Sequence, residues 1–141
     1  MADDDRPIAA LLRTAEAASE RRRQEHLAAA GYPGIDGSLI PVLRAVADQE
    51  TTMSALGDRL GLPLMETSRL LGLLEARDYV RRLGRPGDLR RRVARITDAG
   101  RAALHTDDQL AADQDRRLMD RLGAQDVTAA RRVLDALSQM G

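Results

Sequence analysis

The arginines are the residues of this chain whose distribution points most directly to chemistry. The 141 residues contain 22 arginines and no lysine, balanced by 22 acidic residues, so the formal net charge is zero. The balance is uneven along the chain, because residues 59–95 hold ten arginines against four acids, a net +6, and the remainder carries −6. Arginine offers a planar, bidentate donor that matches phosphates and base edges. The sequence therefore predicts one polyanion-binding region within an acidic frame.

The sequence offers few residues for catalysis, redox chemistry or metal binding. The absence of cysteine excludes disulfides, thiolate metal sites, a cysteine nucleophile and a cysteine redox switch. Two histidines disfavour a multi-histidine zinc site. No nucleophile–base pair, phosphate-binding loop or metal motif is present, so we expect no catalytic residues, no metal and no cofactor, and a protein that is not an enzyme. The acidic N-terminus, and the lack of an apolar stretch of about 18–20 residues, predict a cytoplasmic protein without membrane contact.

Apolar residues recur at helical spacing over most of the chain. Low aromatic content also favours packed helices over a β-sandwich. The expected helices cover about 6–30, 37–47, a short stretch with core residues Leu56 and Leu60 that Thr51 or Thr52 can cap, 63–77, 97–122 and 126–140. Narrow, alanine-rich stripes on the first and the last two of these predict that they pack across a dimer interface.

The helix expected over 63–77 has two distinct faces. Its apolar spacing places four residues on a buried stripe: Thr67, Leu70, Leu71 and Leu74. The opposite face carries Met65, Ser68, Arg69 and Gly72 at helical spacing. This second face is therefore expected to point away from the core.

A β-hairpin is expected directly after this helix. Residues 79–83 look like a strand, 84–88 are a dense turn signal, and 90–96 look like the returning strand. The arms and turn carry seven arginines. Thr97 can cap the long helix that follows, and the Asp107–Asp108 pair on that helix is expected to face water.

The order of these motifs resembles the MarR family of transcriptional regulators over most of the chain. The matching segments are LGDRLGL at 56–62, SRLL at 68–71, LE at 74–75, YVRR at 79–82, GDLRR at 87–91 and ITDAGR at 96–101. The spacing of nine residues from Asp88 to Thr97 is also that of the family. The resemblance implies a mainly α (α+β) winged helix-turn-helix with a two-stranded hairpin as its wing. The DNA-binding part would span 36–96, flanked by dimerisation helices at 6–30 and 97–140.

The resemblance also implies what the chain does and with which residues. Members are typically homodimeric repressors that bind pseudo-palindromic double-stranded DNA, and many release it on binding a small, often phenolic, effector. By position, Arg90 matches the wing arginine that enters the minor groove, and Asp88 matches the acid that orients it. Ser68 and Arg69 match the base-reading face of the recognition helix, where Met65 also lies. Further arginines of the hairpin would meet phosphates or extend into solvent, namely Arg81, Arg82, Arg85 and Arg91.

The sequence departs from the family at several positions. Met65 and Glu66 stand where small polar residues are usual, Leu89 replaces an arginine, and Asp78 replaces a glycine, although aspartate tolerates a left-handed backbone. A charged run is also often only a solvated face or a set of partners for nearby acids. The alternative function is therefore a winged-helix protein-interaction module, with Met65 and Leu64 as an apolar patch.

Two residues could line an effector pocket. His26 lies on the first helix near the loop at 31–34, although an ordinary histidine of the helix surface is the more common case. Tyr32 could cover such a pocket or only pack the loop.

Overall fold

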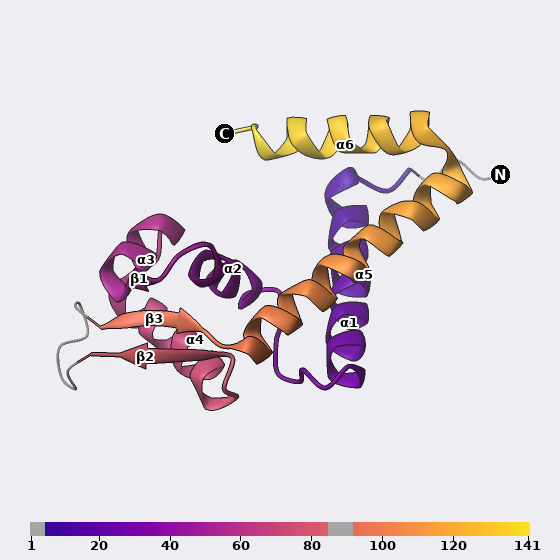
Figure 1. Cartoon of the computed structure of the whole chain (residues 1–141). Coiled ribbons are helices and arrows are strands. Elements are labelled where there is room, and N and C mark those ends of the chain that lie inside the picture. The colour runs from indigo at the N-terminus through magenta and orange to yellow at the C-terminus, as the bar shows by residue number, and fades with distance from the viewer. Residues whose placement is uncertain (1–4, 85–91) are drawn as a thin grey trace. The chain divides into compact units, whose positions relative to one another are not determined.

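Figure 1 shows a computed structural model of the chain, which describes residues 5–84 and 92–141. In chain order the described elements are α1 (Ile8–Ala29), α2 (Ile40–Asp48), β1 (Thr51–Thr52), α3 (Met53–Leu60), α4 (Leu64–Ala76), β2 (Val80–Leu83), β3 (Val93–Ile96), α5 (Asp98–Leu122) and α6 (Ala124–Ser138). The mainly helical class with a small antiparallel sheet is confirmed. The chain divides into two compact units, one up to Asp107 and one from Asp108 onward.

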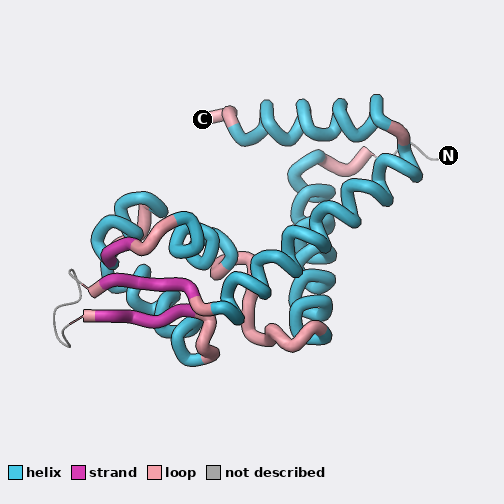
Figure 2. The backbone as a smooth tube through the Cα atoms, viewed as in Figure 1, coloured by secondary structure: helices cyan, strands magenta, loops and turns pink. Residues whose placement is uncertain are grey.

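The first unit contains the sheet, whose strand order is β1-β3-β2 and whose pairs are antiparallel. Figure 2 shows the three strands lying together with helices against them. Val80 faces Ile96 and Arg82 faces Ala94 on the inner side of the sheet, while Arg81 faces Arg95 on the outer side. β1 was not expected, because two residues are too few for an alternating pattern. Of the expected strand 90–96, residues 93–96 form β3.

The core of this unit joins α1, α2, α3, α4, the sheet and the start of α5. Its fully buried side chains include Leu27, Leu43, Leu56 and Leu71, each worth about 1.5–3 kcal/mol of transfer free energy. The buried stripe predicted for α4 is confirmed at all four positions. Burying this stripe turns the opposite face of α4 outward. Leu60, expected in the core, is only partly buried against it.

The ends of the helices follow local side-chain chemistry. Thr52, rather than Thr51, caps α3, since its Oγ1 accepts from the backbone N–H of Ala55 at 3.1 Å. Thr97 caps α5 by accepting from the N–H of Gly100 at 3.1 Å, as expected, and its hydroxyl donates to the carbonyl of Asp78 at 2.6 Å. Asp78 itself adopts a left-handed φ of 64°. Aspartate tolerates this backbone conformation better than most residues, so it can take the place of a glycine at this turn.

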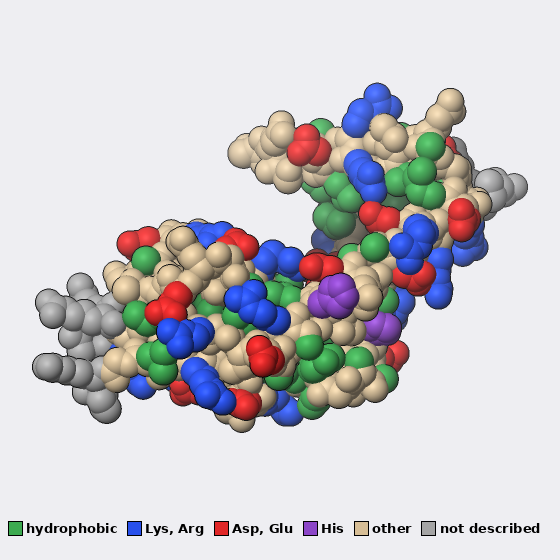
Figure 3. Space-filling view, viewed as in Figure 1, with side chains coloured by type: hydrophobic (Ala, Val, Ile, Leu, Met, Phe, Trp, Pro, Cys, Tyr) green, Lys and Arg blue, Asp and Glu red, His purple; other side chains and the backbone are tan. Residues whose placement is uncertain are grey.

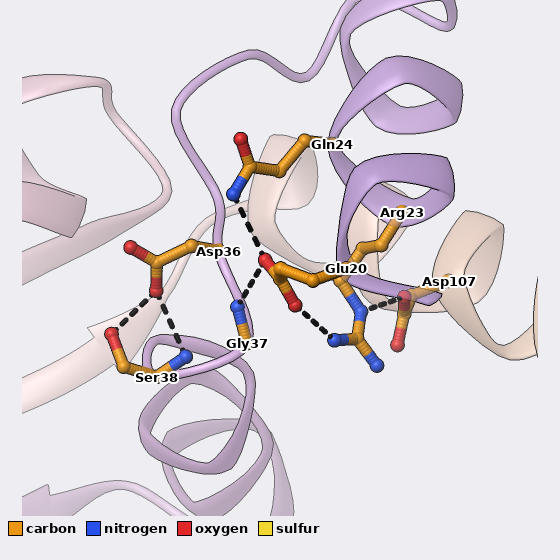
Figure 4. A network of polar contacts seen from close by, with 7 residues as sticks. All are labelled: Glu20, Arg23, Gln24, Asp36, Gly37, Ser38 and Asp107. Atoms are coloured by element: carbon orange, nitrogen blue, oxygen red, sulfur yellow. Dashed lines mark hydrogen bonds and ion pairs between the residues drawn. The ribbon is translucent and has the colours of Figure 1, made fainter. Parts of the chain in front are cut away.

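A polar network ties α1 to the turn before α2 and to α5 (Figure 4). Glu20 accepts from the backbone N–H of Gly37 at 2.8 Å and pairs with Arg23 at 2.8 Å, and the Arg23 Nε also donates to Asp107 at 2.8 Å. The expectation that Asp107 faces water is wrong, because its side chain is only 7% exposed and pairs with an arginine 84 residues away. Asp108 is exposed.

The second unit consists of the end of α5 and α6. Arg131 on α6 pairs with Asp115 on α5 at 2.9 Å, and Val127 is the residue of α6 that is buried. Large apolar side chains in this unit are exposed, namely Leu118, Met119, Leu122, Val133, Leu134 and Met140. Among the described residues of both units, no helix has the length and apolar character needed to cross a bilayer.

Candidate nucleic-acid interface

The outward face of α4 presents the residues that the sequence analysis placed there. Met65 is 73% exposed, Arg69 is exposed, and Ser68 is partly exposed. The helix begins after a sharp turn, in which Gly61 ends α3 with a left-handed φ of 67° and Pro63 precedes Leu64. α3, this turn and α4 form the helix-turn-helix. Its second helix can therefore offer polar side chains to a partner surface.

Arg69 is held in an ion pair on this face. Its Nη2 and Nε lie 2.7 and 2.9 Å from the two carboxylate oxygens of Glu66, one turn earlier. The hydrogen bonds from Arg69 lower the pKa of Glu66 below its ordinary value. Both side chains remain in solvent, so the pair can exchange for another partner at small cost. Arg69 thus meets an incoming ligand as part of a near-neutral pair.

Arg82 occupies a different position from the one expected. It was expected to contact phosphates or extend into solvent, but its side chain is only 13% exposed and lies between β2 and α4. Its guanidinium contacts the Glu75 carboxylate at 3.2 and 3.3 Å, and its Nη1 donates to the Ser68 hydroxyl at 3.2 Å. The physical reason is strand alternation: Arg82 shares the inner face of the sheet with Val80, toward α4.

The contacts with Arg82 shift the pKa of the Glu75 carboxyl group. Partial burial acts to raise its pKa, but the hydrogen bonds and the charge of Arg82 outweigh burial, so the pKa of Glu75 lies below its ordinary value. The backbone N–H of Arg82 donates to the same carboxylate at 3.2 Å. Glu75 and Arg82 therefore fasten α4 to β2.

Most other arginines described between 59 and 95 also have acidic partners. Arg59 pairs with Asp48 at 2.6 Å and Arg95 with Glu50 at 2.7 Å, while Arg81 lies 3.8 Å from Asp78. Figure 3 accordingly shows basic and acidic side chains beside one another on the face that it draws. Two of these acids, Asp48 and Glu50, lie outside the segment that was counted as net +6. The free positive charge of the described part is therefore lower than the segment's composition indicates.

Several expected site residues fall outside the described residues. Arg85, Asp88, Arg90 and Arg91 all belong to 85–91, so their roles at the wing stay predictions from the resemblance. Arg81 is described and is exposed on the outer face of the sheet, opposite Arg95. Met65, Ser68 and Arg69 are brought together on α4, as expected.

Neither of the two expected pocket residues lines the groove that the structure contains beside α1. His26 is exposed on α1, and Tyr32 is partly buried against the core. The groove has a volume of about 520 Å³ and runs along α1 beside the turn at 36–38, lined by Arg13, Glu16, Ala17, Glu20, Gln24, Asp36, Gly37 and Ser38. Its α1 residues recur at helical spacing on one side of the helix, a signal that is present in the sequence.

Comparisons with known proteins give one family model and several similar solved structures. A MarR family model matches residues 34–91. Solved structures match over nearly the whole chain: the reduced form of MarR from E. coli has 23% identity and a TM-score of 0.69, covering 96% of this chain and 98% of that one. A mutant of E. coli MarR complexed with operator DNA has 22% identity and a TM-score of 0.68, covering 93% of each chain. A probable transcriptional regulator from Pseudomonas aeruginosa has 21% identity and a TM-score of 0.67, covering 95% of this chain and 98% of that one.

A comparison with curated proteins gives no match. The family model covers the helix-turn-helix and the start of the hairpin, which are the elements that position Met65, Ser68 and Arg69. The family model thus confirms the resemblance to the MarR family over residues 34–91, and the solved structures show that the fold is similar over nearly the whole chain.

Proposed function

We propose that this chain is a homodimeric, sequence-specific DNA-binding regulator that acts as a repressor. The observation that carries the proposal is the outward face of α4, where Ser68 and Arg69 lie on the second helix of a helix-turn-helix. That helix is the one that enters the major groove in this motif. Arg69 suits bidentate contact with guanine, and Ser68 suits a base edge or phosphate. A relative of the same fold has been solved with operator DNA.

Arg69 must exchange Glu66 for DNA as its partner when the chain binds. The guanidinium of Arg69 leaves Glu66 when it meets a base or phosphate, and the exposed position of the pair keeps that exchange cheap. Glu66 then lies close to the same groove edge, where a carboxylate can accept from a cytosine amino group. By the resemblance, Arg90 enters the minor groove, and Asp88 orients it, while Arg81, Arg85 and Arg91 contact phosphates.

Dimerisation is supported by apolar side chains that a single chain leaves in water. The described second unit exposes Leu118, Met119 and Leu122 on α5 and Val133 and Leu134 on α6. An apolar surface of this kind marks an interaction site. A second copy of the chain, covering these faces, would give a regulator with two recognition helices for the two halves of a pseudo-palindromic site.

Release by a small effector is the third part of the proposal. The groove beside α1 touches both this helix and the turn at 36–38 that leads into α2. A small aromatic effector in it would contact a flanking helix and the entry to the DNA-binding part together. Binding there would bias how α2 to α4 meet DNA.

Fluorescence anisotropy with DNA from beside the chain's own gene tests the function. Wild-type chain should bind that DNA with an affinity that falls steeply with salt. Arg69→Ala should weaken specific binding by about ten- to a hundredfold, and Arg90→Ala should also weaken it strongly, both without loss of the dimer in sedimentation. Arg121→Ala, an exposed arginine of α5, is the matched control and should bind as wild type does. Wild-type binding by Arg69→Ala would rule out the proposed role of α4.

The protein-interaction alternative has one supporting observation, the exposure of Met65. The patch is smaller than expected, because Leu64 packs against the core instead of joining Met65. If the wild-type chain bound no DNA even at low salt, this alternative would replace the proposal.

A further inference from the structure

The three residues that face β2 from α4 form a cradle for one guanidinium. Ser68, Gly72 and Glu75 follow one another at helical spacing along α4. The Arg82 guanidinium lies against all three, since a Cβ on Gly72 would come within 3.4 Å of its Nη2. Arg82 therefore has its donors directed at its own protein and not at solvent.

The contact between Arg82 and Ser68 favours one use of the Ser68 hydroxyl over the other. The Ser68 Oγ accepts a hydrogen bond from Arg82 Nη1 at 3.2 Å. A hydroxyl has one proton and two acceptor lone pairs, so with one lone pair engaged it keeps its proton for another partner, and the positive guanidinium beside it disfavours a second donor. Ser68 is partly exposed, so an acceptor on a partner molecule can reach this hydroxyl. The hydroxyl is thus presented as a hydrogen-bond donor.

We propose that Glu75 is a positioning residue that determines DNA specificity, because it holds Arg82 away from phosphates and thereby fixes Ser68 as a donor. This inference rests on the proposed function. A fixed donor selects acceptors, which are phosphate oxygens and the acceptor atoms of base edges, such as guanine N7 and O6. A released Arg82 would instead add a contact to the phosphate backbone, which carries no sequence information.

The test measures DNA affinity against salt concentration for four chains: wild type, Ser68→Ala, Glu75→Gln and the double variant. Each is titrated with the duplex that the wild-type chain selects from a random pool and with an unrelated duplex. In Glu75→Gln, release of Arg82 should steepen the slope of log K against log salt by about 0.9, which corresponds to one added phosphate contact. The ratio of specific to unrelated binding should fall at least fivefold.

The double variant separates positioning from simple loss of charge. Ser68→Ala should lower the specificity ratio in the wild-type background but have little further effect in Glu75→Gln, because the donor is already misplaced there. Asp115→Asn is the matched control, since it releases Arg131 on α6, outside the part proposed to bind DNA, and its slope and ratio should equal those of wild type. An equal steepening in Asp115→Asn would overturn the proposal in favour of a general charge effect.

Folding is checked by circular dichroism, and a second variant covers a failure of Glu75→Gln to fold. Arg82→Met removes the cation itself, so it should lower the specificity ratio without steepening the slope. If wild type binds no DNA at low salt, the proposed function fails and this inference with it. If wild type binds DNA specifically but the variants share its salt slope and specificity ratio, the inference alone fails. It also fails if the effects of Ser68→Ala and Glu75→Gln simply add in the double variant.

Discussion

Replacing Arg23 by methionine should destabilise the first unit strongly, because it leaves the carboxylate of Asp107 without its partner. The Asp107 side chain is 7% exposed and accepts from Arg23 Nε at 2.8 Å. Removing one member of a fully buried pair costs about 3–5 kcal/mol. Arg23 is 28% exposed, so water can reach the vacated position and reduce that cost. We expect a loss of about 2–3 kcal/mol in the free energy of unfolding.

Urea denaturation at one fixed protein concentration measures this loss, because self-association would otherwise shift the midpoint. Asp107→Asn removes the buried charge, so the double variant should recover part of the loss, with a coupling energy of about 1–2 kcal/mol. Arg117→Met is the control, since its pair with Asp113 lies in solvent, and it should cost less than about 0.5 kcal/mol. If Arg23→Met costs no more than this control, or if the two changes simply add, the structural role assigned to the pair is refuted.

Three further changes probe the elements that hold the site, all followed by urea denaturation. Thr52→Ala removes the cap of α3 and should cost about 1 kcal/mol; a cost near zero would contradict the cap. Gly100→Ala places a Cβ 2.3 Å from the backbone carbonyl oxygen of Tyr79, which cannot move aside, so the substitution should cost about 1–3 kcal/mol of stability. A neutral effect would show that α5 lies further from Tyr79. Because the pKa of Glu75 is lowered in the folded chain, the stabilisation from its pair with Arg82 is complete above the ordinary value of 4.5 and is lost as pH falls through the lower folded value. Glu75→Gln should therefore lose less stability than wild type below about pH 4.5, and identical acid profiles would contradict the pairing.

Local patterns predicted the parts of the fold that are set by short-range physics. The buried stripe on α4 follows from a period of 3.6 residues, and its burial alone places Ser68 and Arg69 outward. The caps at Thr52 and Thr97 follow from the preference of threonine for that position. The family motifs then placed these helices in the correct order around a hairpin.

Pairings between side chains of different elements could not be predicted in the same way. Asp107 looked like a surface acid, because nothing near it in the sequence indicates that Arg23 packs against it from α1. Arg82 looked like a free cation, because its partner Glu75 comes from the preceding helix, across a turn. Charge counted by segment likewise missed Glu50, which pairs with Arg95 from outside the segment.

The lining of the groove beside α1 could not be predicted from the sequence for the same reason. Its walls come from α1 and from the turn at 36–38, which meet only in the folded chain. The contact between Glu20 and the backbone of Gly37 brings them together. The residue types of His26 and Tyr32 and their nearness to the loop at 31–34 do not locate a groove of this kind.

The most direct test of the central claim is the specificity ratio of the wild-type chain and of Arg69→Ala at about 0.15 M salt. The ratio compares affinity for the duplex selected from a random pool with affinity for an unrelated duplex. The wild-type ratio should be about 10³ or more, and it should fall about ten- to a hundredfold in Arg69→Ala. Equal affinity of the wild-type chain for both duplexes, or an unchanged ratio in Arg69→Ala, would contradict the account.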